Sequence, residues 1–314
     1  MDAALAGSFD HIGPAQLRDA TRWYPDAGGK RLRPVMAMLA CEAAGGQGEQ
    51  ALPIALAVEL VHNFSLVHDD IMDRDATRRG RATVHVKWDE PTAILAGDVL
   101  FARAFEELSR IPDAEAHREA AALLSRAVLK LCEGQALDMA FEHVPMVSVG
   151  DYLTMIRGKT ALLFEAATRG GALSSPKHSA AAVQALSTYG ESFGMAFQIA
   201  DDLLDATGDA KTLGKPWGSD IRAGKRTLLI LEGQANSTAA QRGVIDRVLG
   251  KADATDADVA SVVQVLRECG ALARAEAVRD EHARAADKAL DALPASPARD
   301  ALRALNEWAV TRRS

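Results

Sequence analysis

Two acidic segments of this chain carry carboxylates at a spacing that suits metal binding. The first is Asp69-Asp70-Ile71-Met72-Asp73, and the second is Asp201-Asp202-Leu203-Leu204-Asp205. The outer aspartates of each segment are four residues apart, so on a helix they lie one turn apart and about 40° around the axis. Magnesium binds through one or two carboxylates and completes its shell with water and substrate phosphates. The two segments together therefore suggest a metal-bridged diphosphate site.

A single segment of this kind is more often an ordinary solvated helix end. Here there are two, and each follows a long apolar stretch. Carboxylates at the end of a buried helix are costly unless cations or water neutralise them. The repetition favours a binding site over two unrelated helix ends.

Basic residues that could bind phosphate lie near the acidic segments and in one upstream turn. Two glycines precede the upstream turn, Gly28-Gly29-Lys30-Arg31-Leu32-Arg33-Pro34, and would let backbone approach a ligand closely. Each basic cluster alone could be a solvated turn, but three of them in this setting favour phosphate binding. The three clusters are Lys30 with Arg33, Arg78 with Arg79, and Lys215 with Lys225.

The acidic segments are expected at the ends of two long helices. Apolar residues recur at helical spacing from Pro53 to about Asp73, and again from near His178 to near Gly208. Strand-like alternation is scarce, and neither a repeat nor a compositional linker divides the chain. We therefore expect an all-α fold, a single-domain helical bundle over residues 1–314. Further helices are expected at 92–109, 115–143, 150–172, 225–235, 239–249, 257–290 and 300–312.

Composition limits the classes of partner and the compartment. The 314 residues include 36 Lys and Arg against 43 Asp and Glu, a net charge of -7, so a nucleic-acid surface is not expected. The odd, widely spaced Cys41, Cys132 and Cys269 fit neither a disulfide framework nor a metal site, and we expect buried thiols in a reducing compartment. Without a signal-like start or an uninterrupted apolar run of about 18 residues, the protein is expected to be soluble and cytoplasmic, with no transmembrane segment.

These motifs resemble those of the trans-prenyl diphosphate synthase family, over roughly Gly28 to Lys225. Ala82 and Leu229 stand where that family usually has proline, which changes backbone stiffness rather than ligands. The matching segments are the upstream basic turn, the two acidic segments, Arg78-Arg79-Gly80, Gly97-Asp98-Val99-Leu100, Gly134-Gln135-Ala136-Leu137-Asp138, Lys159-Thr160-Ala161, Gly214-Lys215 and Gly224-Lys225-Arg226-Thr227-Leu228.

The resemblance implies a role for each matching side chain. The diphosphate of isopentenyl diphosphate would be bound by Lys30, Arg33, His62 and Arg79. The allylic diphosphate would be bound by Arg78, Lys159, Lys215 and Lys225. The main Mg²⁺ ligands would be Asp69, Asp73 and Asp201. Metal binding would be assisted, directly or through water, by Asp70, Asp202 and Asp205. The reaction centre would be lined by Thr160 and Gln198.

Helical geometry supports one of these roles independently. His62 lies seven residues before Asp69, which places the two within about 20° of the same helix face. A lone histidine on an apolar helix is more often a core residue. The alignment of His62 with the acidic segment favours a role in the binding site.

The resemblance also implies the architecture and the reaction. The fold would be isoprenoid synthase-like, a bundle around a deep central active-site pocket, and the protein a homodimer. Mg²⁺ would assist ionisation of an allylic diphosphate (dimethylallyl, geranyl or farnesyl), isopentenyl diphosphate would attack the allylic cation, and loss of a proton would complete the condensation.

Product length is expected to depend on the residues before the first acidic segment. Phe64 lies five positions before Asp69, where the family uses a bulky residue as the floor of the chain-elongation pocket. The absence of two extra residues within the first acidic segment resembles enzymes that make geranylgeranyl diphosphate. Periodicity alone would select Ser65 instead, since it lies within about 40° of Asp69. Farnesyl or longer polyprenyl products are the alternative.

Two other classes of protein fit the motifs less well. A terpene cyclase would carry an Asn/Ser/Glu metal motif on the second helix, where this chain has Asp201 to Asp205. A non-catalytic synthase subunit would be expected to lack one acidic segment, and both are complete here. At the C-terminus, Arg312-Arg313 could close over the site, but we expect a frayed basic tail.

Overall fold

The computed structural model describes residues 1–142, 144, 146–208 and 217–312. Within these residues the chain is helical apart from a hairpin of two-residue strands, β1 (Thr77–Arg78) and β2 (Arg81–Ala82), so the predicted all-α class is confirmed. Contacts divide the chain into two compact units, each described by itself. Unit 1 comprises Met1–Val128, Glu165–Ser187 and Ala292–Leu302, and unit 2 comprises Leu129–Phe164, Thr188–Asp291 and Arg303–Ser314. A single domain over 1–314 stays a prediction.

The helices follow the chain from one unit to the other. Those wholly within unit 1 are α1 (Asp2–Gly7), α2 (Ala15–Arg22), the 3₁₀ turn η1 (Pro25–Ala27), α3 (Leu32–Ala43), the 3₁₀ turn η2 (Gly48–Ala51), α4 (Leu52–Met72), α5 (Val84–Lys87) and α6 (Glu90–Leu108). Those within unit 2 are α8 (Val149–Ile156), the π-helical segment η3 (Arg157–Ala161), α12 (Ser219–Ala223), α13 (Leu228–Asn236), α14 (Ala239–Val248), α15 (Asp256–Glu268) and α16 (Ala271–Leu290). Four helices contribute residues to both units: α7 (Ala114–Phe141), α9 (Leu162–Leu173), α10 (Ala180–Thr207) and α17 (Pro297–Thr311).

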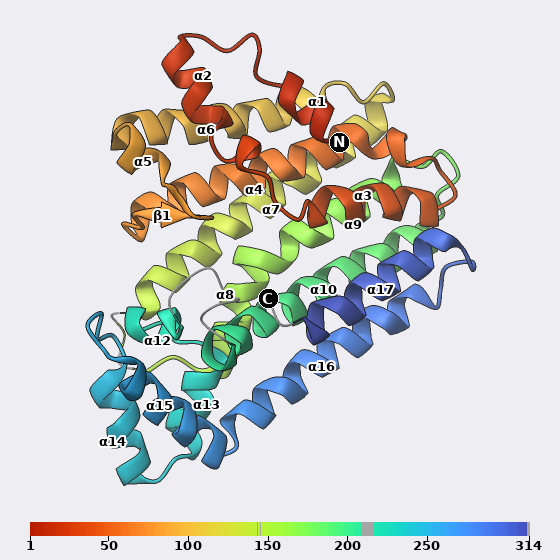
Figure 1. The fold of residues 1–314 in the computed structure, drawn as a ribbon. Coiled ribbons are helices and arrows are strands. Elements are labelled where there is room, and N and C mark those ends of the chain that lie inside the picture. Colours follow the sequence, from red (N-terminus) through yellow and green to blue (C-terminus); the bar gives the residue numbers. More distant parts are fainter. Residues whose placement is uncertain (143, 145, 209–216, 313–314) are drawn as a thin grey trace. The chain divides into compact units, whose positions relative to one another are not determined.

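Helix α4 is the centre of unit 1 and confirms the helix predicted from Pro53 to about Asp73. It packs against α3 and α6 (Figure 1). Leu56 and Leu60 of α4 and Leu100 of α6 are at most 1% exposed, and burying each stabilises the fold by about 1.5–3 kcal/mol. The stretch Gly48–Met72 is apolar enough to cross a membrane, with a mean hydropathy of 1.4, but 67% of its most apolar 18-residue window is buried, as in a core helix.

Unit 2 has its own hydrophobic core, which involves the second predicted long helix, α10. Ile199 of α10 packs in one buried cluster with Tyr152, Leu228 and Leu266. Helix α13 packs against α16, and α14 against α15 (Figure 1). The end of α10 that carries the second acidic segment is thereby attached to a packed core.

Some predicted boundaries are wrong for identifiable reasons. The helix expected over 257–290 is two helices, because Gly270 adopts a left-handed backbone with φ of 76° and ends α15. The helix expected over 150–172 is interrupted by η3. Helices α1, α2 and α3 were not predicted, since they are short and lie among glycine and proline residues. The expectation of buried thiols is wrong for Cys132, which is exposed.

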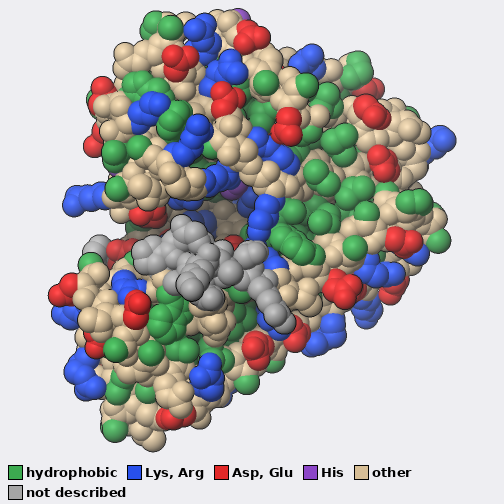
Figure 2. Space-filling model, viewed as in Figure 1, with side chains coloured by type: hydrophobic (Ala, Val, Ile, Leu, Met, Phe, Trp, Pro, Cys, Tyr) green, Lys and Arg blue, Asp and Glu red, His purple; other side chains and the backbone are tan. Residues whose placement is uncertain are grey.

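The surface of the face drawn in Figure 2 carries both signs of charge. Lys and Arg side chains are interspersed with Asp and Glu there, without a continuous basic surface.

One helix contact in unit 1 depends on a glycine, and we predict the effect of adding a side chain at that position. A Cβ at Gly171 of α9 would lie 2.0 Å from the carbonyl oxygen of Ala37 in α3. Gly171→Ala should therefore lower the free energy of unfolding by about 1–3 kcal/mol. Gly243→Ala is the matched control, because its Cβ would meet only Arg247 Nη1 at 3.6 Å, and helix propensity should raise stability by about 0.5–1 kcal/mol. Urea unfolding measures the free energy of unfolding of both variants. An unchanged value for Gly171→Ala would contradict the close packing of α9 against α3.

Candidate active site

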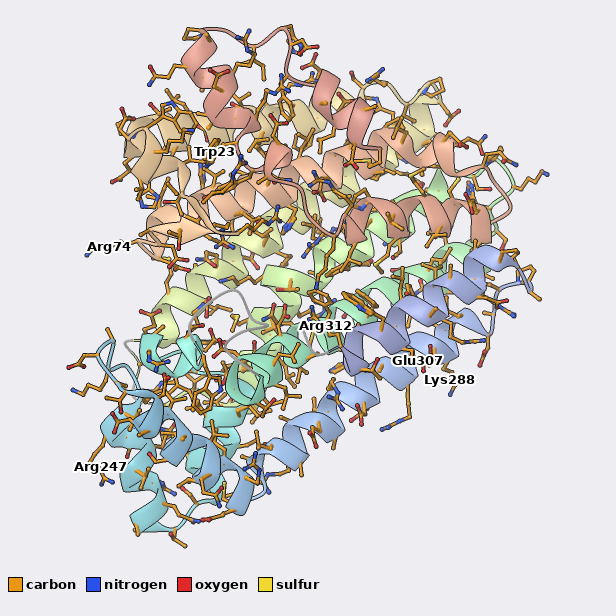
Figure 3. The ribbon with its side chains drawn as sticks, in the orientation of Figure 1. Trp23, Arg74, Arg247, Lys288, Glu307 and Arg312 are labelled. Carbon is orange, nitrogen blue, oxygen red and sulfur yellow. The ribbon has the colours of Figure 1, made fainter. Side chains whose placement is uncertain are left out.

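The first acidic segment forms the last turn of α4 and its cap. Asp73 is the C-cap, Arg74 follows in the left-handed region with φ of 56°, and the amides of Arg74 and Asp75 donate to carbonyls of the last helical turn at 3.3 and 3.0 Å. This hydrogen-bond pattern is a Schellman motif. The Arg74 side chain points away from the protein (Figure 3). The motif ends the helix so that Asp69 is partly exposed and Asp73 is exposed.

Asp70, between them, is fully buried and held by protein donors. Arg78 donates both Nε and Nη2 to Asp70 Oδ1 at 2.6 Å, and the Tyr24 hydroxyl donates to Oδ2. Burial and the bond to Asp70 raise the pKa of Tyr24 above its usual range, so the hydroxyl keeps its proton. Asp70 therefore attaches the hairpin and the segment before α3 to α4, a role that was not predicted for it.

The hairpin turn brings Arg79 to the glycines of the upstream basic turn. Arg79 and Gly80 both have positive φ, 52° and 72°, as a two-residue type I′ turn requires. Arg79 donates a hydrogen bond to the Gly28 carbonyl, and a Cβ at Gly29 would lie 3.1 Å from Arg79 Nη1. The glycines thus make room for an arginine of the same unit.

Three of the residues predicted to bind isopentenyl diphosphate share one electrostatic environment. The pKa of His62 lies well below its usual range, first because the ring is desolvated and then because of the positive charges of Arg33 and Arg79. His62 is therefore neutral at pH 7. A bound diphosphate would reduce the repulsion within this group. Lys30, the fourth predicted residue, is exposed on the segment that also carries Arg33.

Arg31, to which no role was assigned from the sequence, holds this segment in place. It caps α3 in the left-handed region, with φ of 50°. Its side chain, 12% exposed, donates to Glu59 Oε1 at 2.7 Å, to the Pro25 carbonyl at 2.7 Å and to Asp2 Oδ1 at 3.1 Å. Glu59 is buried in α4, three residues before His62. The Arg31–Glu59 pair therefore sets the position of the basic turn along α4.

Phe64 and Ser65 occupy different environments. The Phe64 ring contacts Phe101 of α6, with centroids 5.4 Å apart, and His68, at 4.8 Å. Ser65 is buried, and its hydroxyl donates to the His62 carbonyl at 2.9 Å. Phe64 therefore belongs to an aromatic cluster in unit 1, whereas the Ser65 hydroxyl is used within the helix.

The second acidic segment lies in the last turns of α10, in unit 2. The Asp202 carboxylate accepts hydrogen bonds from the Tyr152 hydroxyl at 2.6 Å and from Gln198 Nε2 at 2.9 Å. Burial, and then the negative charge of Asp220, raise the pKa of Asp202 to about 7. Asp202 thus parallels Asp70, since each is the second aspartate of its segment, is buried, and accepts a hydrogen bond from a tyrosine.

Asp205 is also buried, whereas Asp201 is accessible. Asp205 accepts from the Ser219 hydroxyl at 2.6 Å and from the Asp220 amide at 3.0 Å, which attaches α12 to the end of α10. The Asp201 side chain is 45% exposed and pairs with Arg312. Of the second segment, Asp201 is the aspartate most open to a ligand.

Lys159 and Thr160 are positioned by the π-helical segment η3. Cβ atoms at Gly134 of α7 and Gly158 of η3 would lie 2.4 Å and 2.6 Å from backbone atoms of the opposing segment, so two glycines allow the backbones to touch. Such π-helical turns are frequent at functional sites. Lys159 Nζ then pairs with Asp138 Oδ2 at 2.6 Å.

The structure brings Thr160 together with the second acidic segment. Its hydroxyl donates to Gln198 Oε1 at 2.8 Å, and Gln198 bonds to Asp202. The two residues predicted to line the reaction centre therefore form one chain of hydrogen bonds. Lys225 precedes α13, with its amide bonded to the Asp220 carbonyl at 2.9 Å, while Lys215 lies outside the described residues.

The donor set fits a hard divalent cation that takes part of its shell from substrate. Among the residues described, no three His, Cys, Asp or Glu side chains form a ready-made metal cluster. Mg²⁺ does not need one, because it commonly uses one or two carboxylates together with water and phosphate oxygens. Accessible carboxylates that could supply such ligands are Asp69 and Asp73 in unit 1 and Asp201, which also pairs with Arg312, in unit 2. Asp70, Asp202 and Asp205 are buried against protein donors.

Comparison with known proteins agrees with these observations. A profile of the polyprenyl synthetase family matches residues 14–266. The chain is 43% identical to the short chain isoprenyl diphosphate synthase of Methanothermobacter thermautotrophicus, covering 99% of this chain and 95% of that protein. The crystal structure of geranylgeranyl pyrophosphate synthetase from Pyrococcus horikoshii matches with a TM-score of 0.93 at 40% identity, over 99% and 94% of the two chains. A polyprenyl synthase of Caulobacter crescentus, complexed with calcium and isoprenyl diphosphate, matches with a TM-score of 0.90 at 36% identity, over 100% and 94%. With the predicted all-α fold and both acidic segments in place, the chain belongs to the polyprenyl synthetase family and is a trans-prenyltransferase.

Proposed function

We propose that this prenyltransferase condenses isopentenyl diphosphate with an allylic diphosphate and makes geranylgeranyl diphosphate as its main product. The observation that carries the proposal is that the aspartates of each acidic segment differ in burial. In each, a buried aspartate anchors the helix end, while Asp69, Asp73 and Asp201 keep exposed carboxylate surface. Incubation with isopentenyl and geranyl diphosphates and Mg²⁺, followed by chromatography of the products, tests the reaction.

Isopentenyl diphosphate would bind through Lys30, Arg33, His62 and Arg79. The pKa of His62 is lowered first by desolvation and then by the positive charges of Arg33 and Arg79. That concentration of positive charge supports this assignment, because a diphosphate would offset it. Neutral His62 can donate one ring N–H, and the arginines can bind phosphate oxygens in bidentate fashion.

The allylic diphosphate would bind beside the acidic segments, with Lys159, Lys215, Lys225 and Arg78 adding positive charge. Arg78 would act partly through Asp70, to which it is already bonded. Divalent cations held by Asp69, Asp73 and Asp201 would neutralise the diphosphate and stabilise the departing pyrophosphate. The carboxylate oxygens of these residues indicate Mg²⁺ as the cation. The calcium and isoprenyl diphosphate bound by the Caulobacter relative support such a site.

The condensation needs no side-chain nucleophile. The allylic carbon–oxygen bond breaks, the double bond of isopentenyl diphosphate supplies the electron pair for the new carbon–carbon bond, and a proton is lost to the departing pyrophosphate. Thr160 and Gln198 would orient polar groups at the reacting end, and Lys159, held by Asp138, would stabilise negative charge. Homodimerisation and a cytoplasmic location stay predictions.

We predict that Asp69→Ala or Asp201→Ala lowers turnover by about 100-fold or more, because each removes a direct metal ligand. Asp69→Ala should retain or raise the melting temperature, since it removes negative charge from an acidic cluster. Asp201→Ala should lower it without unfolding the protein, because it also removes the ion-pair partner of the buried Arg312. Asp253→Ala, an exposed aspartate between α14 and α15, is the control and should behave like the parent. Full activity of either site variant at saturating Mg²⁺ would refute the assignment of two metal-binding segments.

We predict that Arg31→Met raises the KM for isopentenyl diphosphate by about tenfold with little change in kcat, because misplaced binding groups weaken positioning. The single change also leaves Glu59 buried without its cation, which costs about 3–5 kcal/mol. Arg31→Met combined with Glu59→Met should therefore recover stability but not affinity. Asp2→Asn, which removes an exposed partner of Arg31, is the control. Recovery of the KM in the double variant would show that the pair acts only on stability.

We predict that Phe64→Ala shifts the products upward by one or more five-carbon units, because removal of the ring opens space beside Phe101. Ser65→Ala should leave the products unchanged, since its hydroxyl serves the helix backbone. Chromatography of the dephosphorylated products measures both. A shift in Ser65→Ala but not in Phe64→Ala would favour the residue that helical periodicity alone selects.

A further inference from the structure

The C-terminal end of α17 is not a frayed tail at Arg312. The Arg312 side chain is only 5% exposed, so the expectation of a frayed end is wrong for this residue, while Arg313 lies outside the described part of the chain. Figure 3 shows Arg312 beside α10, whereas Glu307 of the same helix is exposed and points away. A buried guanidinium is costly unless its surroundings compensate it.

The surroundings of Arg312 come from the parts of α10 and α17 that belong to unit 2. Its Nη2 donates to Asp201 Oδ1 at 2.5 Å and to the Phe197 carbonyl at 3.3 Å. The guanidinium lies over the Phe197 ring, 4.0 Å from the centroid, and 5.4 Å from that of Trp308. An ion pair, a backbone acceptor and two aromatic rings therefore hold one cation in place.

This arrangement fixes a carboxylate without burying it. Phe197 is one helical turn before Asp201, so Arg312 bridges that turn and restricts the rotation of the Asp201 side chain. Asp201 nevertheless stays 45% exposed. The other two aspartates of the segment, Asp202 and Asp205, are 7% and 1% exposed. Asp201 is thus both oriented and accessible.

We propose that Arg312 is a positioning residue that holds Asp201 ready to bind a divalent cation. The inference rests on the proposed metal role of Asp201. Carboxylates that ligate metals are commonly hydrogen-bonded by outer partners, whose loss costs about 10–100-fold in metal affinity. Held at Oδ1, the carboxylate loses less side-chain entropy when a cation binds.

The opposite effect, competition between Arg312 and the cation for Asp201, is less favourable. Displacement of Arg312 would give up its stacking on Phe197 and Trp308 as well as the backbone bond. Repulsion between the guanidinium and a nearby divalent cation is reduced when a negatively charged diphosphate binds with the metal.

The test is a titration with Mn²⁺ in the presence of inorganic pyrophosphate. The electron paramagnetic resonance signal of free Mn²⁺ measures how much of the metal is bound. Arg312→Gln should weaken binding by about tenfold or more, and Arg312→Lys should fall between that variant and the parent, because an ammonium can reach the carboxylate but stacks less well. Arg303→Gln is the matched control, since Arg303 of the same helix pairs with Asp291, whose side chain is 71% exposed. Melting temperatures show whether each variant is folded.

Asp201→Asn separates failure of this inference from failure of the proposed function. If Asp201→Asn binds Mn²⁺ as the parent does, the proposed metal role of Asp201 is wrong. If it weakens binding while Arg312→Gln does not, the positioning role alone is overturned. Tighter binding by Arg312→Gln would also overturn it, because Arg312 would then compete with the cation.

Discussion

A buried carboxylate bonded to a tyrosine hydroxyl fixes each acidic segment of this enzyme. Asp70 accepts from Tyr24, and Asp202 accepts from Tyr152. In both segments the tyrosine comes from an earlier part of the chain, so the bond joins the helix end to its own unit. A buried carboxylate is tolerated only when donors satisfy it. The neighbouring aspartates can then remain exposed without loss of order at the helix end.

Another buried carboxylate, Glu59, balances part of the positive charge in unit 1. Desolvation of the His62 ring, and then the positive charges of Arg33 and Arg79, lower the pKa of His62 and keep it neutral. Glu59 offsets part of this charge through its bond to Arg31. Arg33 and Arg79 thus keep positive charge where a phosphate group is proposed to bind, while the charge of Arg31, which supports their segment, is neutralised by Glu59.

Backbone geometry is the third constraint on the site. Arg31 and Arg79 adopt left-handed conformations that cost free energy for a residue with a long side chain, and strained residues of this kind cluster at functional sites. Gly134 and Gly158 allow η3 to touch α7, so that Lys159 reaches Asp138. In each case hydrogen bonds or close packing hold a local conformation that sequence propensity would disfavour.

The sequence by itself determined the helical class, the two long helices and the positions of the acidic segments, because hydrophobic periodicity and motif spacing are local properties. It also placed His62 on the face of Asp69, and that inference needed only helix geometry. It could not separate the aspartates that face donors from those that face solvent, since all six share one residue type and spacing. Only the tertiary structure decided that Asp70, Asp202 and Asp205 bind protein groups, that Arg31 supports the basic turn, and that Arg312 is held at Asp201. Apart from the bond between Asp70 and Arg78, these contacts join residues at least 14 positions apart in the chain, and burial in the folded protein gives them their energetic weight.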